Sequence, residues 1–184
     1  MIAPPYLQPG DKIAIAATAR KISWQEVQPA INMLSKWGLD VCLASNLVGN
    51  CHQFAGTDRQ RTIGLQECLD YPEIKAIICA RGGYGTVRII DTIDFTPLRK
   101  NPKWIIGYSD VTVLHSHIHT NLEMETLHAT MPVNFPSDGS ENESTATLRK
   151  ALFGEKLSYS IKTGNLSRQG KATGILTGGN LSMR

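Results

Sequence analysis

Two short segments of this 184-residue chain carry side chains and glycines that could perform chemistry. The first, residues 107–111 (Gly-Tyr-Ser-Asp-Val), places Ser109 between an apolar, strand-like run and a helical pattern. A serine on a strand-to-helix turn is presented on an exposed bend, and the amide that follows is free to stabilise an oxyanion. The segment departs from the usual Gly-x-Ser-x-Gly elbow, because Val111 takes the last glycine position. A nucleophile and a helix cap formed by Ser109 or Asp110 both remain open interpretations.

The second segment, residues 81–85 (Arg-Gly-Gly-Tyr-Gly), has three glycines in four positions after another apolar run. Glycine allows φ values that side chains forbid and lets backbone amides approach a ligand closely. Such a turn before a helix can hold an anion or an oxyanion, although a tight turn without a ligand fits equally well. Neither a Gly-x-Gly-x-x-Gly fingerprint nor a Walker-type Gly-Lys-Ser/Thr accompanies it.

Histidines offer a possible base or metal ligand near the serine. His115 and His119 are four residues apart and share one face of the expected helix, a spacing that could hold a metal. No third ligand is positioned with them by the sequence, so we expect no metal site. His128 ends a presumed fifth strand at the same rim as Ser109, where it could contact a substrate or make a structural hydrogen bond.

Alternating strand-like and helical patterns must position these residues, and this alternation indicates βα units with a parallel sheet. The expected strands are residues 12–17, 41–44, 76–80, 104–107 and 125–129. The expected helices are a segment from a capping box at Ser23 and Glu26 to Gly38, and residues 57–70, 87–93, 111–118 and 143–153. Because ligands bind beyond the carboxyl ends of parallel strands, both turns are expected at the functional edge of the sheet.

Composition excludes several classes of protein. A net charge of +3 without any basic cluster argues against nucleic-acid binding, and no apolar run reaches the roughly 18–20 residues of a membrane span. The first residues do not resemble a secretory signal, so we expect a soluble, cytoplasmic protein. The cysteines form no close pair for zinc or redox chemistry, and a secreted disulfide framework is disfavoured: they are Cys42, Cys51, Cys68 and Cys79.

The composition of the chain changes after Met131, where a loop rich in proline and serine precedes one further helix. We expect one α/β domain over residues 1–155. Residues 156–184 are expected to form a linker and the beginning of a second domain, with strand-like alternation at Tyr159 and Ile161.

Four motifs together resemble the LD-carboxypeptidase (muramoyltetrapeptide carboxypeptidase) family of serine peptidases, in that family's order and approximate spacing. They are residues 9–13 (Pro-Gly-Asp-Lys-Ile), 81–85, 106–110 (Ile-Gly-Tyr-Ser-Asp) and 176–182 (Leu-Thr-Gly-Gly-Asn-Leu-Ser). The resemblance implies a flavodoxin-like or Rossmann-like parallel sheet flanked by helices. It also implies removal of the terminal D-alanine from murein tetrapeptides during cytoplasmic cell-wall recycling, without a metal or organic cofactor, in a protein that tends to form homodimers.

The same resemblance assigns roles to particular residues. Ser109 corresponds to the nucleophile, and the backbone amides of Gly83 and Asp110 correspond to the oxyanion donors. Substrate contacts are expected from the rest of the glycine turn and from the fifth strand: Arg81, Gly82, Tyr84 and His128. The family's glutamate and histidine partners lie in a carboxyl-terminal domain and match no residue here, so residues 1–184 alone are expected to be nearly inactive.

Two departures from the family pattern bear on substrate contacts. Residues 17–20 (Ala-Thr-Ala-Arg) replace a turn that usually contains serine and proline, and Ala129 follows His128 where glycine is frequent. Three alternatives stay open: a self-immunity hydrolase of a peptide–nucleotide antibiotic, a murein-peptide-binding module without catalysis, and a nucleotide-binding domain. The last is disfavoured because no acidic ribose-binding residue has a clear position after the first βα unit.

Overall fold

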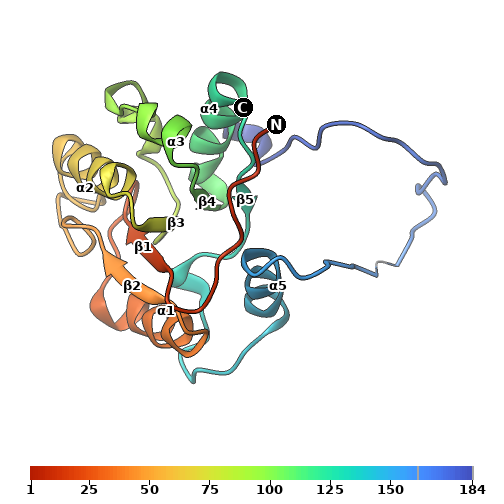
Figure 1. Cartoon of the computed structure of the whole chain (residues 1–184), viewed down its shortest axis with the longest axis horizontal. Coiled ribbons are helices and arrows are strands. Elements are labelled where there is room, and N and C mark those ends of the chain that lie inside the picture. Colours follow the sequence, from red (N-terminus) through yellow and green to blue (C-terminus); the bar gives the residue numbers. More distant parts are fainter. Residues whose placement is uncertain (161, 184) are drawn as a thin grey trace.

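A computed structural model describes residues 1–160 and 162–183, and its centre is a parallel sheet (Figure 1). The strands follow the order β2-β1-β3-β4-β5. This order is the flavodoxin-like one, which confirms the predicted fold class. The strands are β1 (Lys12–Ala16), β2 (Asp40–Leu43), β3 (Ile74–Cys79), β4 (Trp104–Gly107) and β5 (Leu127–His128).

Helices cover both faces of the sheet (Figure 1). Ala14 and Ala16 of β1 point into the core shared with α2, α3 and α4, whereas Ile13 and Ile15 point toward α1 and α5. Successive strand side chains face opposite ways, so a strand covered on both sides must be apolar throughout. The helices are α1 (Trp24–Lys36), α2 (Asp58–Asp70), α3 (Thr96–Lys100), α4 (Thr112–Leu122) and α5 (Glu143–Leu152).

The predicted helix starts are confirmed by their caps. The hydroxyl of Ser23 accepts the amide of Glu26 at 3.3 Å, and the carboxylate of Glu26 accepts the amide of Ser23 at 2.8 Å. Thr57 and Gln60 form the same reciprocal pair at the start of α2. These caps satisfy amides that the first helical turn leaves without partners. Gly38, with φ +86°, turns the chain after α1 as expected.

The prediction of a helix over residues 87–93 is wrong. The chain forms two 3-10 turns there, Thr86–Arg88 and Ile90–Thr92. The carbonyl of Ile89 accepts both the amide and the hydroxyl of Thr92, and these i→i+3 contacts tighten the backbone beyond an α-helix. Pro97 likewise does not mark a helix exit but stands in the first turn of α3, where proline is tolerated.

The last segment lies outside the packed layers. The chain leaves α5, extends away and returns beside α4 (Figure 1), where the amide of Asn180 donates to the hydroxyl of Thr112 at 3.0 Å. No described residue of 156–183 belongs to a strand, so the strand-like alternation is not confirmed at Tyr159; Ile161 lies outside the described residues. Among the described helices, none combines the length and apolar character needed to cross a membrane.

Candidate active site

Ser109 occupies a strained bend immediately after β4. Its φ of +62° lies in the left-handed region, which costs a non-glycine residue roughly 1–2 kcal/mol. Gly107, with φ +155°, makes the bend possible, because a β-carbon there would lie 2.8 Å from Val111 Cγ2. Val111 therefore packs under the bend in place of the last glycine of the usual elbow. Strain at a serine between a strand and a helix is a feature of nucleophile turns.

Gly82 brings the glycine turn into contact with this serine. A β-carbon on Gly82 would lie 3.0 Å from Ser109 Cβ, 3.2 Å from its Oγ and 3.5 Å from the amide nitrogen of Asp110. A side chain at this position would force its neighbours to shift by a few tenths of an ångström. The two turns that the sequence singled out, separated by more than twenty residues, therefore meet at one point of the sheet edge.

The other residues of the glycine turn point to different neighbours. Gly83 is exposed with φ +114°, and a β-carbon there would lie 2.6 Å from Cδ of Arg20. Arg81, expected to contact substrate, forms an ion pair with Glu26 at 3.1 Å. The ring of Tyr84 is exposed and lies 6.3 Å from that of Phe54.

Asp110 connects the two turns through its side chain as well as its position. Its fully buried carboxylate accepts the amide of Thr86 at 2.9 Å through Oδ2. Its second oxygen, Oδ1, has no hydrogen-bond partner among the described residues. The sequence suggested only a backbone donor or a helix cap at Asp110, so this tertiary role of the carboxylate was missed.

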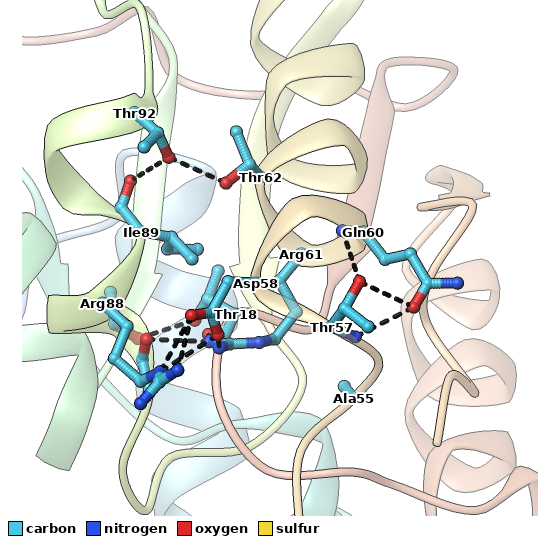
Figure 2. Close-up of polar contacts among 12 residues, drawn as sticks. Thr18, Ala55, Thr57, Asp58, Gln60, Arg61, Thr62, Arg88, Ile89 and Thr92 are labelled. Atoms are coloured by element: carbon cyan, nitrogen blue, oxygen red, sulfur yellow. Dashed lines mark hydrogen bonds and ion pairs between the residues drawn. The ribbon is translucent and has the colours of Figure 1, made fainter. Parts of the chain in front are cut away.

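Sequence reasoning also missed Arg61, which lies on α2 and is completely buried. Figure 2 shows its side chain reaching from α2 toward Thr18 at the end of β1, beside Asp58 and Arg88. The guanidinium donates to the carbonyls of Thr18 at 2.6 Å and Gly85 at 2.7 Å, and it pairs with Asp58. No sequence signal marks Arg61, because the two carbonyls that it binds belong to distant turns.

His115 makes a buried hydrogen bond to the end of β4, just before Ser109. Its Nε2 donates to the carbonyl of Gly107 at 2.9 Å, which leaves Nδ1 unprotonated and without a partner among the described residues. Burial lowers the pKa of His115 below its ordinary value, against the raising effect of the Gly107 carbonyl, and His128 lowers it further. No group of three potential metal ligands occurs in the described part of the chain.

His128 is exposed at the end of β5, as predicted, with its ring centroid 6.1 Å from that of His115 and 6.2 Å from that of Tyr108. Two cavities adjoin it. One of about 790 Å³ lies between α4, β5 and residues 174–179, and one of about 550 Å³ lies toward α5. Ser109 lines neither of these two cavities, although its neighbour Tyr108 lines the second.

The flavodoxin-like sheet and the opposed serine and glycine turns define an α/β domain with a candidate acyl-transfer site. Residues 13–129 match the LD-carboxypeptidase N-terminal domain, and the chain belongs to that family.

Relatives and solved structures agree with this assignment. The chain is 37% identical over 183 residues to a probable murein peptide carboxypeptidase of Bacillus subtilis, covering 98% of this chain and 57% of that protein. It also resembles a muramoyltetrapeptide carboxypeptidase structure from Oxalobacter formigenes (TM-score 0.66, 26% identity, 76% of this chain and 47% of that one). An MccF-like protein structure from Bacillus anthracis matches with TM-score 0.75 and 25% identity, over 83% of this chain and 47% of that one. The chain thus spans about half the length of these proteins.

Proposed function

We propose that this chain is the nucleophile-bearing domain of a serine carboxypeptidase that removes the terminal D-alanine from murein tetrapeptides. The contact between Gly82 and the strained Ser109 carries the proposal, since it places the glycine turn beside the serine side chain. The names of the relatives support a murein peptide as the substrate class. We further propose that the protein acts in the cytoplasm, in cell-wall recycling, as a homodimer and without metal, cofactor or nucleic-acid partner.

In the proposed reaction, Ser109 Oγ attacks the carbonyl carbon of the bond before the D-alanine. The amides of Gly83 and Asp110 stabilise the negative oxygen of the tetrahedral intermediate. The serine proton passes to a base and then to the departing D-alanine nitrogen as the C–N bond breaks. Water then hydrolyses the acyl-serine and releases the tripeptide.

The proposed base is the glutamate–histidine pair that the family resemblance implies, and no residue of 1–184 is assigned to it. Loss of a triad member costs on the order of 10⁴–10⁶ in turnover. We therefore expect residues 1–184 by themselves to release D-alanine only at a trace rate. Residues 1–155 are the proposed nucleophile domain, and residues 156–184 the proposed linker to the partner residues.

A boronic acid analogue of the tetrapeptide tests Ser109 without requiring turnover, because boron accepts the serine oxygen and becomes tetrahedral. Boron NMR and intact mass should show an adduct with the 184-residue chain, and Ser109→Ala should form none. Ser116→Ala, on α4 away from the bend, is the matched control and should form the adduct normally. An adduct that survives Ser109→Ala, or no adduct in the unsubstituted chain, would overturn the assignment of the nucleophile.

A second candidate function is hydrolysis of a peptide–nucleotide antibiotic, and the similarity to the MccF-like structure favours it. Titration calorimetry with the conjugate and with the tetrapeptide separates the two substrates, since the preferred one should bind at least tenfold tighter. Tetrapeptide binding without any boronate adduct would instead indicate a binding module.

A further inference from the structure

The peptide group between Gly85 and Thr86 is held on both sides by buried charges. Its carbonyl oxygen accepts Arg61 Nη1 at 2.7 Å, and its N–H donates to Asp110 Oδ2 at 2.9 Å. Neither charged residue is exposed to solvent. The cation meets the negative end of the peptide dipole and the anion meets the positive end, so both charges favour the same orientation of this peptide.

Arginine suits this place because its planar fork donates in several fixed directions. The same Nη1 reaches the carbonyl of Thr18 at 2.6 Å, while Nη2 pairs with Asp58. The hydroxyls of Thr18 and Thr86 are 3.0 Å apart and add a further link. One guanidinium thus joins the end of β1, helix α2 and the glycine turn, as Figure 2 shows for Thr18 and Asp58.

Gly85 belongs to this arrangement rather than to a ligand site. Its φ is +143°, and a β-carbon there would lie 2.7 Å from Arg61 Nη1. A side chain at this position would therefore displace the guanidinium from the carbonyl that it binds. The third glycine of the turn is therefore explained by its positive φ and by the space that Arg61 occupies.

Asp110 follows Ser109 directly, so its carboxylate fixes the serine bend and the glycine turn relative to each other. Burying two charges is costly, and Arg61 Nε and Asp110 Oδ1 have no partner among the described residues. An apolar pair would hold a loop at lower cost. The charges are therefore explained better by the orientation that they impose than by stability.

We propose that Arg61 and Asp110 are positioning residues, which fix the Gly83 and Asp110 amides relative to Ser109 because they bind the two sides of the Gly85–Thr86 peptide. Neither side chain touches substrate in this role. The functional meaning rests on the proposed carboxypeptidase reaction, but the two hydrogen bonds to the Gly85–Thr86 peptide can be measured without it.

Amide hydrogen exchange and ¹⁵N chemical shifts of the 184-residue chain test whether these hydrogen bonds hold the Gly85–Thr86 peptide, in the unsubstituted protein and in Arg61→Gln. We expect the Thr86 amide to exchange at least tenfold faster in Arg61→Gln, with shifted resonances for Gly82, Gly83 and Asp110. The amides of Ile15 and Ile78, in the central strands, should keep their protection. Arg61→Lys keeps the charge without the fork and should give an intermediate effect. The control is Arg59→Gln, on the exposed side of the same helix, which should change none of these amides.

Unchanged Thr86 exchange in Arg61→Gln would overturn the proposal. So would a loss of protection at Ile15 and Ile78 equal to that at Thr86, or the failure of both Arg61 variants to fold, since Arg61 would then serve global stability alone. Failure of the proposed function is seen separately, as the absence of a Ser109 boronate adduct in an unsubstituted chain whose Thr86 amide is still protected from exchange.

Discussion

His115 Nε2 donates to the carbonyl oxygen of Gly107, so helix α4 holds the end of β4 from which the serine bend departs. The bond is 2.9 Å long and buried, and it requires the Nε2–H tautomer. The pKa of His115 is lowered mainly by burial, so the folded state disfavours the charged imidazole.

This relationship predicts a specific loss of stability in acid. The unfolded chain protonates His115 near 6.5, whereas the folded chain does so only at lower pH. Below 6.5 the unfolded state therefore binds more protons, and the free energy of unfolding falls as the pH drops toward the folded pKa. Urea titrations should show a smaller decline for His115→Gln, whose amide can still donate to Gly107. His119→Gln, on the more exposed part of α4, is the control and should decline like the unsubstituted protein; equal declines in all three would refute the assignment.

Because Ser109 has a left-handed φ, a glycine variant should be more stable than an alanine variant at this position, the reverse of the order within a helix. Both Ser109→Gly and Ser109→Ala remove the hydroxyl, but only alanine has a β-carbon, which is strained at φ +62°. Ser109→Gly should be more stable than Ser109→Ala by about 1 kcal/mol in chemical denaturation.

The control for this prediction is Ser116, within α4. There glycine should be less stable than alanine by about 1 kcal/mol, as in an ordinary helix. The same order at both positions would mean that Ser109 is not held in the strained conformation.

The approach of Gly82 to Ser109 predicts that Gly82→Ala pushes the two turns apart. Its methyl group would meet Ser109 Cβ at 3.0 Å, tighter than ordinary contact, and the surroundings must shift at a cost of about 1–3 kcal/mol. The boronate adduct at Ser109 should weaken at least tenfold, because the backbone donors move with the turn. In Gly170→Ala the added carbon meets no atom within 4 Å, so this control should keep both stability and adduct. Undiminished adduct formation by Gly82→Ala would show that the turn contact is irrelevant to the chemistry.

The proposed boundary near residue 155 predicts where trypsin cuts first. Lys156, Lys162, Arg168 and Lys171 are exposed and lie outside helices and strands, where backbone fits a protease most readily. Brief digestion followed by intact mass measurement should give a stable core ending at Lys156 or shortly after it. First cleavage between β1 and α5 would contradict the boundary.

Local patterns were enough to predict most of the framework. Apolar runs such as residues 104–107 are buried on both faces, and the capping boxes at Ser23 and Thr57 bond only to neighbours three residues away. The serine and glycine turns were recognised for the same reason, since the conformation of a turn depends on the types of a few adjacent residues. Prediction failed at residues 87–93, where the chain forms 3-10 turns in place of the expected helix and the hydroxyl of Thr92 bonds to the carbonyl of Ile89.

The sequence by itself thus determined the parallel α/β framework, the edge of the sheet that carries both turns, and the family resemblance that the comparisons confirmed. Only the tertiary structure decided that Gly82 touches Ser109, that Arg81 turns to Glu26, and that Arg61 and Asp110 hold one peptide between them. Periodicity and turn preferences report interactions within a few residues. Contacts between residues 24 to 55 positions apart arise only when the packed sheet brings its turns together.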